Sequence, residues 1–112
     1  MRGTAELARK FKISLSEDNL VLRRPSDYAE KLHITTGYLN DVIKKTTGSS
    51  VTYWIHQEVS IRSKHALYHT DLDIKEIAYQ LGFRDHVYFI RLFRKLNGVS
   101  PLKFRLLKRR NN

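Results

Sequence analysis

The fold is decided by residues 73–105, which read DIKEIAYQLGFRDHVYFIRLFRKLNGVSPLKFR. Apolar residues recur at helical spacing on both sides of Gly82-Phe83. This spacing predicts a short helix over Ile74–Leu81 and a longer one over about Asp85–Leu96. The whole chain holds only 5 Gly and 2 Pro, and they sit where helices should start or stop. The stretch therefore predicts helices joined by tight turns.

Residues that favour helix ends flank these two segments. Asp73 and Glu76 form a capping-box pair that opens the first helix, and Gly98 is expected to end the second. Ser100-Pro101 then predicts a short basic helix, with serine at the cap and proline in the first turn.

The same pattern occurs a second time, earlier in the chain. Before the turn the matched residues are 49 positions apart: Ala29 with Ala78, Leu32 with Leu81, and Ile34 with Phe83. After the turn they are 50 apart: Leu39 with Phe89, Val42 with Leu92, Ile43 with Phe93, Lys45 with Lys95, Gly48 with Gly98, Ser50 with Ser100, and Trp54 with Phe104. The change of offset falls in the turn, where an insertion costs least.

Each copy reads as a short helix, a tight turn, a longer helix and a glycine. Ala29 and Ala78 leave room for two helices to cross closely, while Ile34 and Phe83 fill the corner. This is the pattern of a helix-turn-helix unit. The alternative is a generic helical bundle built from a duplicated hairpin.

The remaining segments also read as helices. Thr4 to about Glu17 is amphipathic, Pro25-Ser26-Asp27 opens a helix that Ser26 is expected to cap, and Ser50 is expected to cap a helix over Val51–His69. The inward face of that long helix is expected to consist of Ile55, Val59, Ser63, Ala66 and Leu67.

The prediction is an all-α fold of seven helices, with two helix-turn-helix units joined by a long linker helix. The expected divisions are an N-terminal helix or linker (1–25), a first unit (26–50), the linker helix (51–70) and a second unit with its basic C-terminal helix (71–112).

Charge limits the class of partner. The chain carries 21 Lys or Arg against 11 Asp or Glu, a formal net charge of +10. Such a field favours nucleic acid first and an anionic membrane surface second; a merely soluble basic protein is the plainer interpretation. No Cys is present, and no apolar run approaches the roughly 20 residues of a membrane span.

With these motifs in place, the chain resembles the DNA-binding domain of the AraC/XylS family of bacterial transcription regulators, over about Ser26–Arg105. The residues that carry the resemblance are Ile77-Ala78, Gly82-Phe83, Asp85, Tyr88-Phe89, Arg91, Phe93-Arg94, Gly98, Ser100-Pro101 and Phe104-Arg105. The first copy matches the family's looser pattern.

The resemblance implies that the third and sixth helices enter adjacent segments of the major groove of double-stranded DNA. The candidates for reading bases are then Gly37, Asn40, Asp41, His86, Val87 and Arg91. The candidates for contacting the DNA backbone are Thr36, Lys44, Lys45, Arg84, Arg94, Lys95, Lys103 and Arg105.

The chain departs from the family's pattern at several of these positions. Asp41 stands where the family often carries Arg; a carboxylate repels phosphate, although it can accept a hydrogen bond from cytosine N4. Gly37 offers no side chain. Val59 replaces a frequent Arg of the linker helix, and Val87 and Ile90 stand where small hydroxyl residues are common.

The resemblance also implies partners and a location. RNA polymerase is one expected partner. A sensor or dimerisation domain in a longer parent chain is another, unless the domain acts alone. The expected location is the bacterial cytoplasm, at the nucleoid and not at a membrane. A different class of function is a basic adaptor that contacts proteins without reading DNA.

Other features are weighed against simpler explanations. His65 and His69 have a spacing that zinc can use, but no third ligand is evident, so no metal site is expected. No nucleophile or acid–base arrangement indicates an enzyme, and no cofactor is expected. Trp54 is expected in the core.

Overall fold

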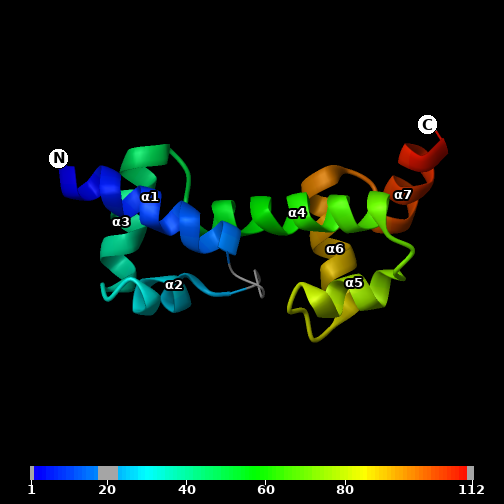
Figure 1. The fold of residues 1–112 in the computed structure, drawn as a ribbon, viewed down its shortest axis with the longest axis horizontal. Helices are drawn as coiled ribbons and strands as arrows, with labels where there is room; N and C mark the ends of the chain where they lie inside the picture. The colour runs from blue at the N-terminus through cyan, green and yellow to red at the C-terminus, as the bar shows by residue number, and fades with distance from the viewer. Residues whose placement is uncertain (1, 18–22, 111–112) are drawn as a thin grey trace. The chain divides into compact units, whose positions relative to one another are not determined.

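The computed structural model describes residues 2–17 and 23–110, and the secondary structure of this part of the chain consists of helices joined by turns, without strands (Figure 1). The helices are α1 (Arg2–Glu17), α2 (Pro25–Lys31), α3 (Thr36–Thr47), α4 (Val51–His69), α5 (Ile74–Gln80), α6 (His86–Asn97) and α7 (Pro101–Arg110). The predicted all-α fold of seven helices is confirmed. Within the described ranges, no helix is long and apolar enough to cross a membrane.

The helices form two compact units, Met1–Glu58 and Val59–Asn112. The boundary falls inside α4. The first unit therefore contains α1 to α3 and the start of α4, and the second contains the rest of α4 and α5 to α7.

The first unit is built around an apolar core to which each of its helices contributes. The buried members are Ala8, Phe11, Leu15, Tyr28, Ala29, Leu39, Ile43, Val51 and Ile55. The rings of Phe11 and Tyr28 meet edge to face, with centroids 5.5 Å apart, a favourable aromatic geometry. Trp54 packs against this core while half-buried, as the sequence predicts.

The core of the second unit is richer in aromatic residues. Its buried apolar residues include Val59, Leu67, Ile77, Ala78, Leu81, Phe83, Phe89, Leu92 and Phe93. Phe89 lies between two other phenylalanines, with its ring centroid 5.2 Å from that of Phe83 and 6.1 Å from that of Phe93. Phe104 extends the row, 5.7 Å from Phe93.

The two tight turns have the same hydrogen bonding. The Ile34 amide donates to the Ala29 carbonyl at 3.0 Å, and the Phe83 amide donates to the Ala78 carbonyl at the same distance. The residue before each of these amides has a positive φ: 59° at His33 and 93° at Gly82. The matched alanines thus place the carbonyls that close both turns.

Most of the predicted caps are confirmed. Ser50 Oγ accepts from the Tyr53 amide at 3.0 Å, and Ser100 Oγ accepts from the Lys103 amide at 3.1 Å. Asp73 Oδ1 accepts from the Glu76 amide at 2.8 Å. Gly48 and Gly98 end α3 and α6 in the left-handed conformation, with φ of 83° and 80°.

The predicted cap at Ser26 is wrong. Helix α2 begins at Pro25, so the N-cap is Arg24. Asp27 Oδ2 accepts from the Arg24 amide at 2.8 Å and thereby satisfies the helix entrance. The reason is that proline, with its fixed φ, favours the first helical position and moves the cap one residue back.

Candidate nucleic-acid interface

Helices α3 and α6 begin at equivalent points of the two repeats. Thr35 Oγ1 accepts from the Tyr38 amide at 3.2 Å, and Asp85 Oδ1 accepts from the Val87 amide at 2.9 Å. These N-caps are 50 positions apart, whereas the turn residues Ile34 and Phe83 are 49 apart. The inserted residue is therefore Arg84, which is exposed between Phe83 and the cap.

Helix α3 buries one row of side chains and exposes the opposite face. The buried residues are Leu39, Val42 and Ile43. The base-reading candidates Gly37, Asn40 and Asp41 are all exposed. No atom lies within 4 Å of a Cβ built at Gly37, so this position leaves open space at the surface.

Helix α6 follows the same plan with different chemistry. Its buried residues are Phe89, Leu92 and Phe93. Among the base-reading candidates, Arg91 and Val87 are exposed, and His86 at the first helical position is half-buried. A guanidinium on an exposed helix face can donate two parallel hydrogen bonds to guanine.

Basic residues cluster at the ends of both helices. Lys44 and Lys45 lie in the last turn of α3, and Arg94 and Lys95 lie at the matched positions in α6. All four are exposed, as are Arg84 and Lys103, while Thr36 is half-buried. Cations here stabilise the helix C-terminus and remain available to phosphate oxygens.

Arg105 differs from the other basic phosphate candidates because it is half-buried and bonded within the protein. Its Nε donates to the Leu67 carbonyl at 2.9 Å, and its Nη2 donates to the Thr70 carbonyl at 3.2 Å. Burial lowers the pKa of Arg105, and repulsion from Arg109 adds to this, whereas Asp71 and Asp73 act in the opposite direction. The guanidinium thus covers carbonyls at the end of α4, and these hydrogen bonds compete with the phosphate contact expected from the sequence, which remains untested.

Two exposed faces of this kind, each at the end of a matched tight turn, fit a helix-turn-helix assignment. A family model described as a helix-turn-helix domain matches residues 28–106, which is more than two thirds of the chain. The chain belongs to the AraC/XylS family.

Individual AraC/XylS-type proteins are similar to the chain over most of its length. The Msm operon regulatory protein of Streptococcus mutans is 37% identical over 82 residues, which cover 73% of this chain and 30% of that protein. The C-terminal domain of the response regulator yesN from Fusobacterium nucleatum is 31% identical, with a TM-score of 0.79, over 92% of this chain and 98% of that one.

The fold also matches a domain solved with DNA. The DNA-binding domain of AdpA, in complex with a target DNA, has a TM-score of 0.80 over 97% of this chain and 95% of that one, at 22% identity. With so low an identity, this likeness shows a shared fold alone.

This AraC/XylS chain spans less than a third of the length of the first curated relatives it matches.

Two exposed tyrosines of this AraC/XylS domain were missed as candidates. Tyr38 and Tyr88 occupy the third position of α3 and α6, 50 residues apart, and are 49% and 50% exposed. The repeat alignment already pairs them, and a hydroxyl on this face can donate to phosphate. Their identity in both copies was the available signal.

The histidine pair on α4 lies close together, with ring centroids of His65 and His69 4.5 Å apart. Across residues 2–17 and 23–110, no group of three or more His, Cys, Asp or Glu side chains is placed to hold a metal ion.

Proposed function

We propose that this chain reads double-stranded DNA in a sequence-specific manner, as the DNA-binding domain of a bacterial transcription regulator. The observation that supports this most is the matched exposure of α3 and α6. Each helix buries three apolar side chains and presents a polar face that ends in two basic residues. Such a surface suits a major groove lined by phosphates.

The proposed roles follow from position on each helix. Asn40, His86, Val87 and Arg91 face base edges, with Gly37 admitting close approach and Asp41 accepting from cytosine. Lys44, Lys45, Arg84, Arg94, Lys95 and Lys103 contact phosphates, together with Thr36. Contacts of the first set give sequence preference, and those of the second fix register and supply most of the affinity.

The second unit is proposed to dominate base discrimination. Helix α6 carries Arg91 where α3 carries Asp41, and Arg84 has no counterpart in the first unit. One good bidentate contact discriminates by about 1–3 kcal/mol, so a single Arg–guanine pair can decide the balance.

The domain is further proposed to work in the cytoplasm, at the nucleoid, with RNA polymerase as a partner. Its short span relative to the regulators it resembles supports a longer parent chain with a sensor or dimerisation domain. The regulators it resembles also support a non-enzymatic role.

Selection of binding sites from random duplex DNA tests the proposal. Because both units run in the same chain direction, the selected site should be asymmetric, with two elements centred about 10–10.5 bp apart. A perfect inverted repeat would contradict a single chain that reads with both units. Base changes under α6 should cost more than those under α3, and equal costs would refute the unequal contribution.

The salt dependence of binding provides a second test. Each phosphate contact should contribute a slope of about −0.9 to the logarithm of the binding constant against the logarithm of salt concentration. A slope near zero would favour the adaptor function over DNA binding.

A further inference from the structure

Helix α7 leaves its three leucines at the surface, while an arginine takes one of its inward positions. Its half-buried residues are Phe104 and Arg105, whereas Leu102, Leu106 and Leu107 are 56%, 60% and 42% exposed. A helix at a protein surface normally turns its leucines inward and its arginines to water.

The first repeat provides the comparison, because the start of α4 matches α7 at an offset of 50. There Val51 and Ile55 are buried, and Ile55 stands at the position of Arg105. The three positions that match the exposed leucines are the polar residues Thr52, His56 and Gln57. The leucines of α7 are therefore absent from the equivalent helix, although Trp54 and Phe104 keep the same inward place.

This orientation of α7 is held by hydrogen bonds within the second unit. Besides the bonds from Arg105, Arg109 Nη1 donates to Asp71 Oδ1 at 3.0 Å, and Arg109 Nη2 donates to the Thr70 carbonyl. Phe104 packs against Phe93 on the same side. These contacts fix the rotation of α7 and keep the leucines on the outer side.

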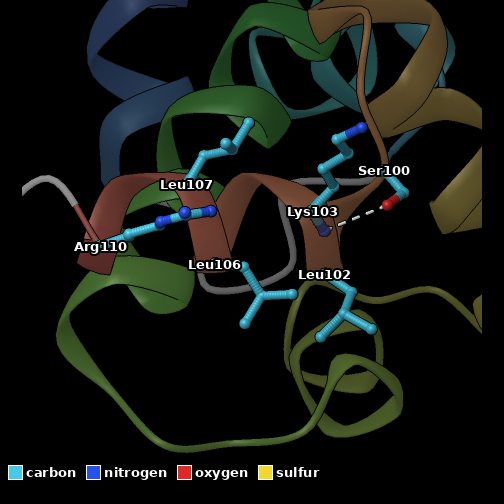
Figure 2. A pocket seen from close by; sticks show the side chains of 6 residues that line it. All are labelled: Ser100, Leu102, Lys103, Leu106, Leu107 and Arg110. Atoms are coloured by element: carbon cyan, nitrogen blue, oxygen red, sulfur yellow. Dashed lines mark hydrogen bonds between the residues drawn. The ribbon is translucent and has the colours of Figure 1, made fainter.

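The outer side of α7 forms an open hollow of about 310 Å³. Leu102 and Leu106 lie along one side of the helix and Lys103 and Leu107 along the other, with Arg110 between them (Figure 2). Three of the six lining residues are leucines, and the charged groups of the lining, Lys103 and Arg110, are positive. Helix α7 has five basic residues and no acidic one.

We propose that this hollow, lined by Leu102, Leu106, Leu107, Lys103 and Arg110, docks an acidic amphipathic helix of a partner protein. Apolar side chains at helical spacing would enter between the leucines, and flanking carboxylates would pair with Lys103 and Arg110. The surface goes beyond the DNA-binding role, because its leucines lie on neither α3 nor α6 and only Lys103 of its lining is among the proposed phosphate contacts.

Charge and shape favour this occupant over two others. A second copy presenting the same face would bring Lys103 and Arg110 of one copy against the same two residues of the other, which is repulsive. An anionic lipid surface attracts basic helices, but α7 has only 10 residues and its leucines border a hollow. A protein helix with protruding side chains fills such a hollow better than a flat bilayer does.

The test uses the DNA-free chain and a synthetic peptide of about 18 residues, long enough to form a helix. The peptide carries leucines at i, i+4 and i+7 and glutamates on the flanks, and the control is a scrambled peptide of the same composition. Fluorescence anisotropy should show saturable binding of the designed peptide and none of the scrambled one. Leu106→Gln should weaken binding about tenfold, equivalent to about 1.4 kcal/mol.

Ile61→Gln is the matched control. The Ile61 side chain on α4 is 61% exposed, nearly the same fraction as the 60% of Leu106, but it lies outside the hollow. It should leave peptide binding unchanged. Leu102→Gln should reproduce the loss, and thermal unfolding and DNA binding of all three variants should stay as in the parent chain. Lys103→Gln with Arg110→Gln should reduce the dependence of peptide binding on salt.

Several results would overturn the proposal. Equal binding of the scrambled peptide, or an equal loss of binding in Ile61→Gln, would show that the hollow is not a specific docking site. A dimer in sedimentation equilibrium that Leu106→Gln abolishes would assign the face to a second copy. Leu106-dependent co-sedimentation with vesicles of phosphatidylcholine and phosphatidylserine, without peptide binding, would assign it to lipid.

Discussion

The two helix-turn-helix units share their internal architecture and differ on their outer surface. Both use an alanine carbonyl to close the turn, a positive φ at its corner, three buried residues on the second helix and a glycine at its end. Outside, α3 carries one acidic and two basic residues, whereas α6 carries three basic residues and no acidic one. Packing constrains the inner positions, so differences in DNA reading must reside in the outer ones.

The cores of the two units also obtain their bulk from different helices. In the first unit α1 supplies Phe11, which packs against Tyr28. In the second unit the buried residues of α4 include the small Ser60 and Ser63, and the large side chains are Phe83, Phe89 and Phe93. The second recognition helix is therefore anchored by its own aromatic residues.

The largest expected effect compares these two anchors. Phe89→Ala should cost about 3–5 kcal/mol of unfolding free energy, and Leu39→Ala at the matched position about 2–4 kcal/mol. Both side chains are fully buried. Urea unfolding measures the totals, and hydrogen exchange should show each loss concentrated in its own unit.

Val87→Ala on the same helix provides the control, because an exposed side chain should change stability by about 0.5 kcal/mol or less. If either core substitution lowered hydrogen-exchange protection equally in both units, the two units would unfold together. Their cores would then not differ in stability.

The second prediction concerns Arg105, which stands where the first repeat has Ile55. Arg105→Ala should cost about 1.5–3 kcal/mol, because it removes charged hydrogen bonds to the Leu67 and Thr70 carbonyls. Since the guanidinium is engaged inside the protein, the salt dependence of DNA binding should stay unchanged.

Two variants calibrate this result. Lys103→Ala should flatten the salt dependence by about one phosphate contact, a slope change of about 0.9. Asp71→Ala should cost about 0.5 kcal/mol or less, because that carboxylate is highly exposed. A flatter slope in Arg105→Ala would establish it as a phosphate contact after all.

Local patterns in the sequence predicted most of the fold, and the predictions that failed have physical reasons. The caps at Ser50, Asp73 and Ser100 depend on neighbours within three residues, so sequence spacing was sufficient. The cap at Ser26 failed because Pro25 competes for the helix start. The hydrogen bonds of Arg105 join residues 35 and 38 positions apart, which no local pattern can reveal.

The candidate site was predictable where the repeat aligned the two helices. Its pairing of Phe89 with Leu39 already implied that Arg91 and Asp41 face outward, and both are exposed. The direction of the α7 leucines was not foreseen, because that helix has apolar residues on both sides. Only its packing shows that Phe104 takes the inner place.

The third prediction tests the charge difference between the recognition helices. Arg91→Ala should cost about 1–3 kcal/mol at a selected site and relax the preference at one base. Asp41→Ala should instead strengthen binding to random duplexes, because it removes a negative charge beside the phosphates, and should relax the preference for cytosine at its own base in the selected site. Gel shifts on selected and random DNA measure both; equal losses on the two DNAs would make Arg91 a phosphate contact only.

The smallest expected effect tests whether the two turns are equivalent. His33 adopts a positive φ of 59°, the only non-glycine residue of the described chain to do so, and the matched residue is Gly82. A side chain in this conformation costs roughly 1–2 kcal/mol, while glycine loses about 0.5–1 kcal/mol of chain entropy on folding. His33→Gly should therefore raise the unfolding free energy by about 0.5–1 kcal/mol, and Gly82→Ala should lower it by a similar amount. Urea denaturation of both variants measures the two changes, with equal m-values showing that the unfolded state is unaltered. If His33→Gly is destabilising instead, the imidazole must make contacts worth more than its backbone strain, and the turns are equivalent in hydrogen bonding alone.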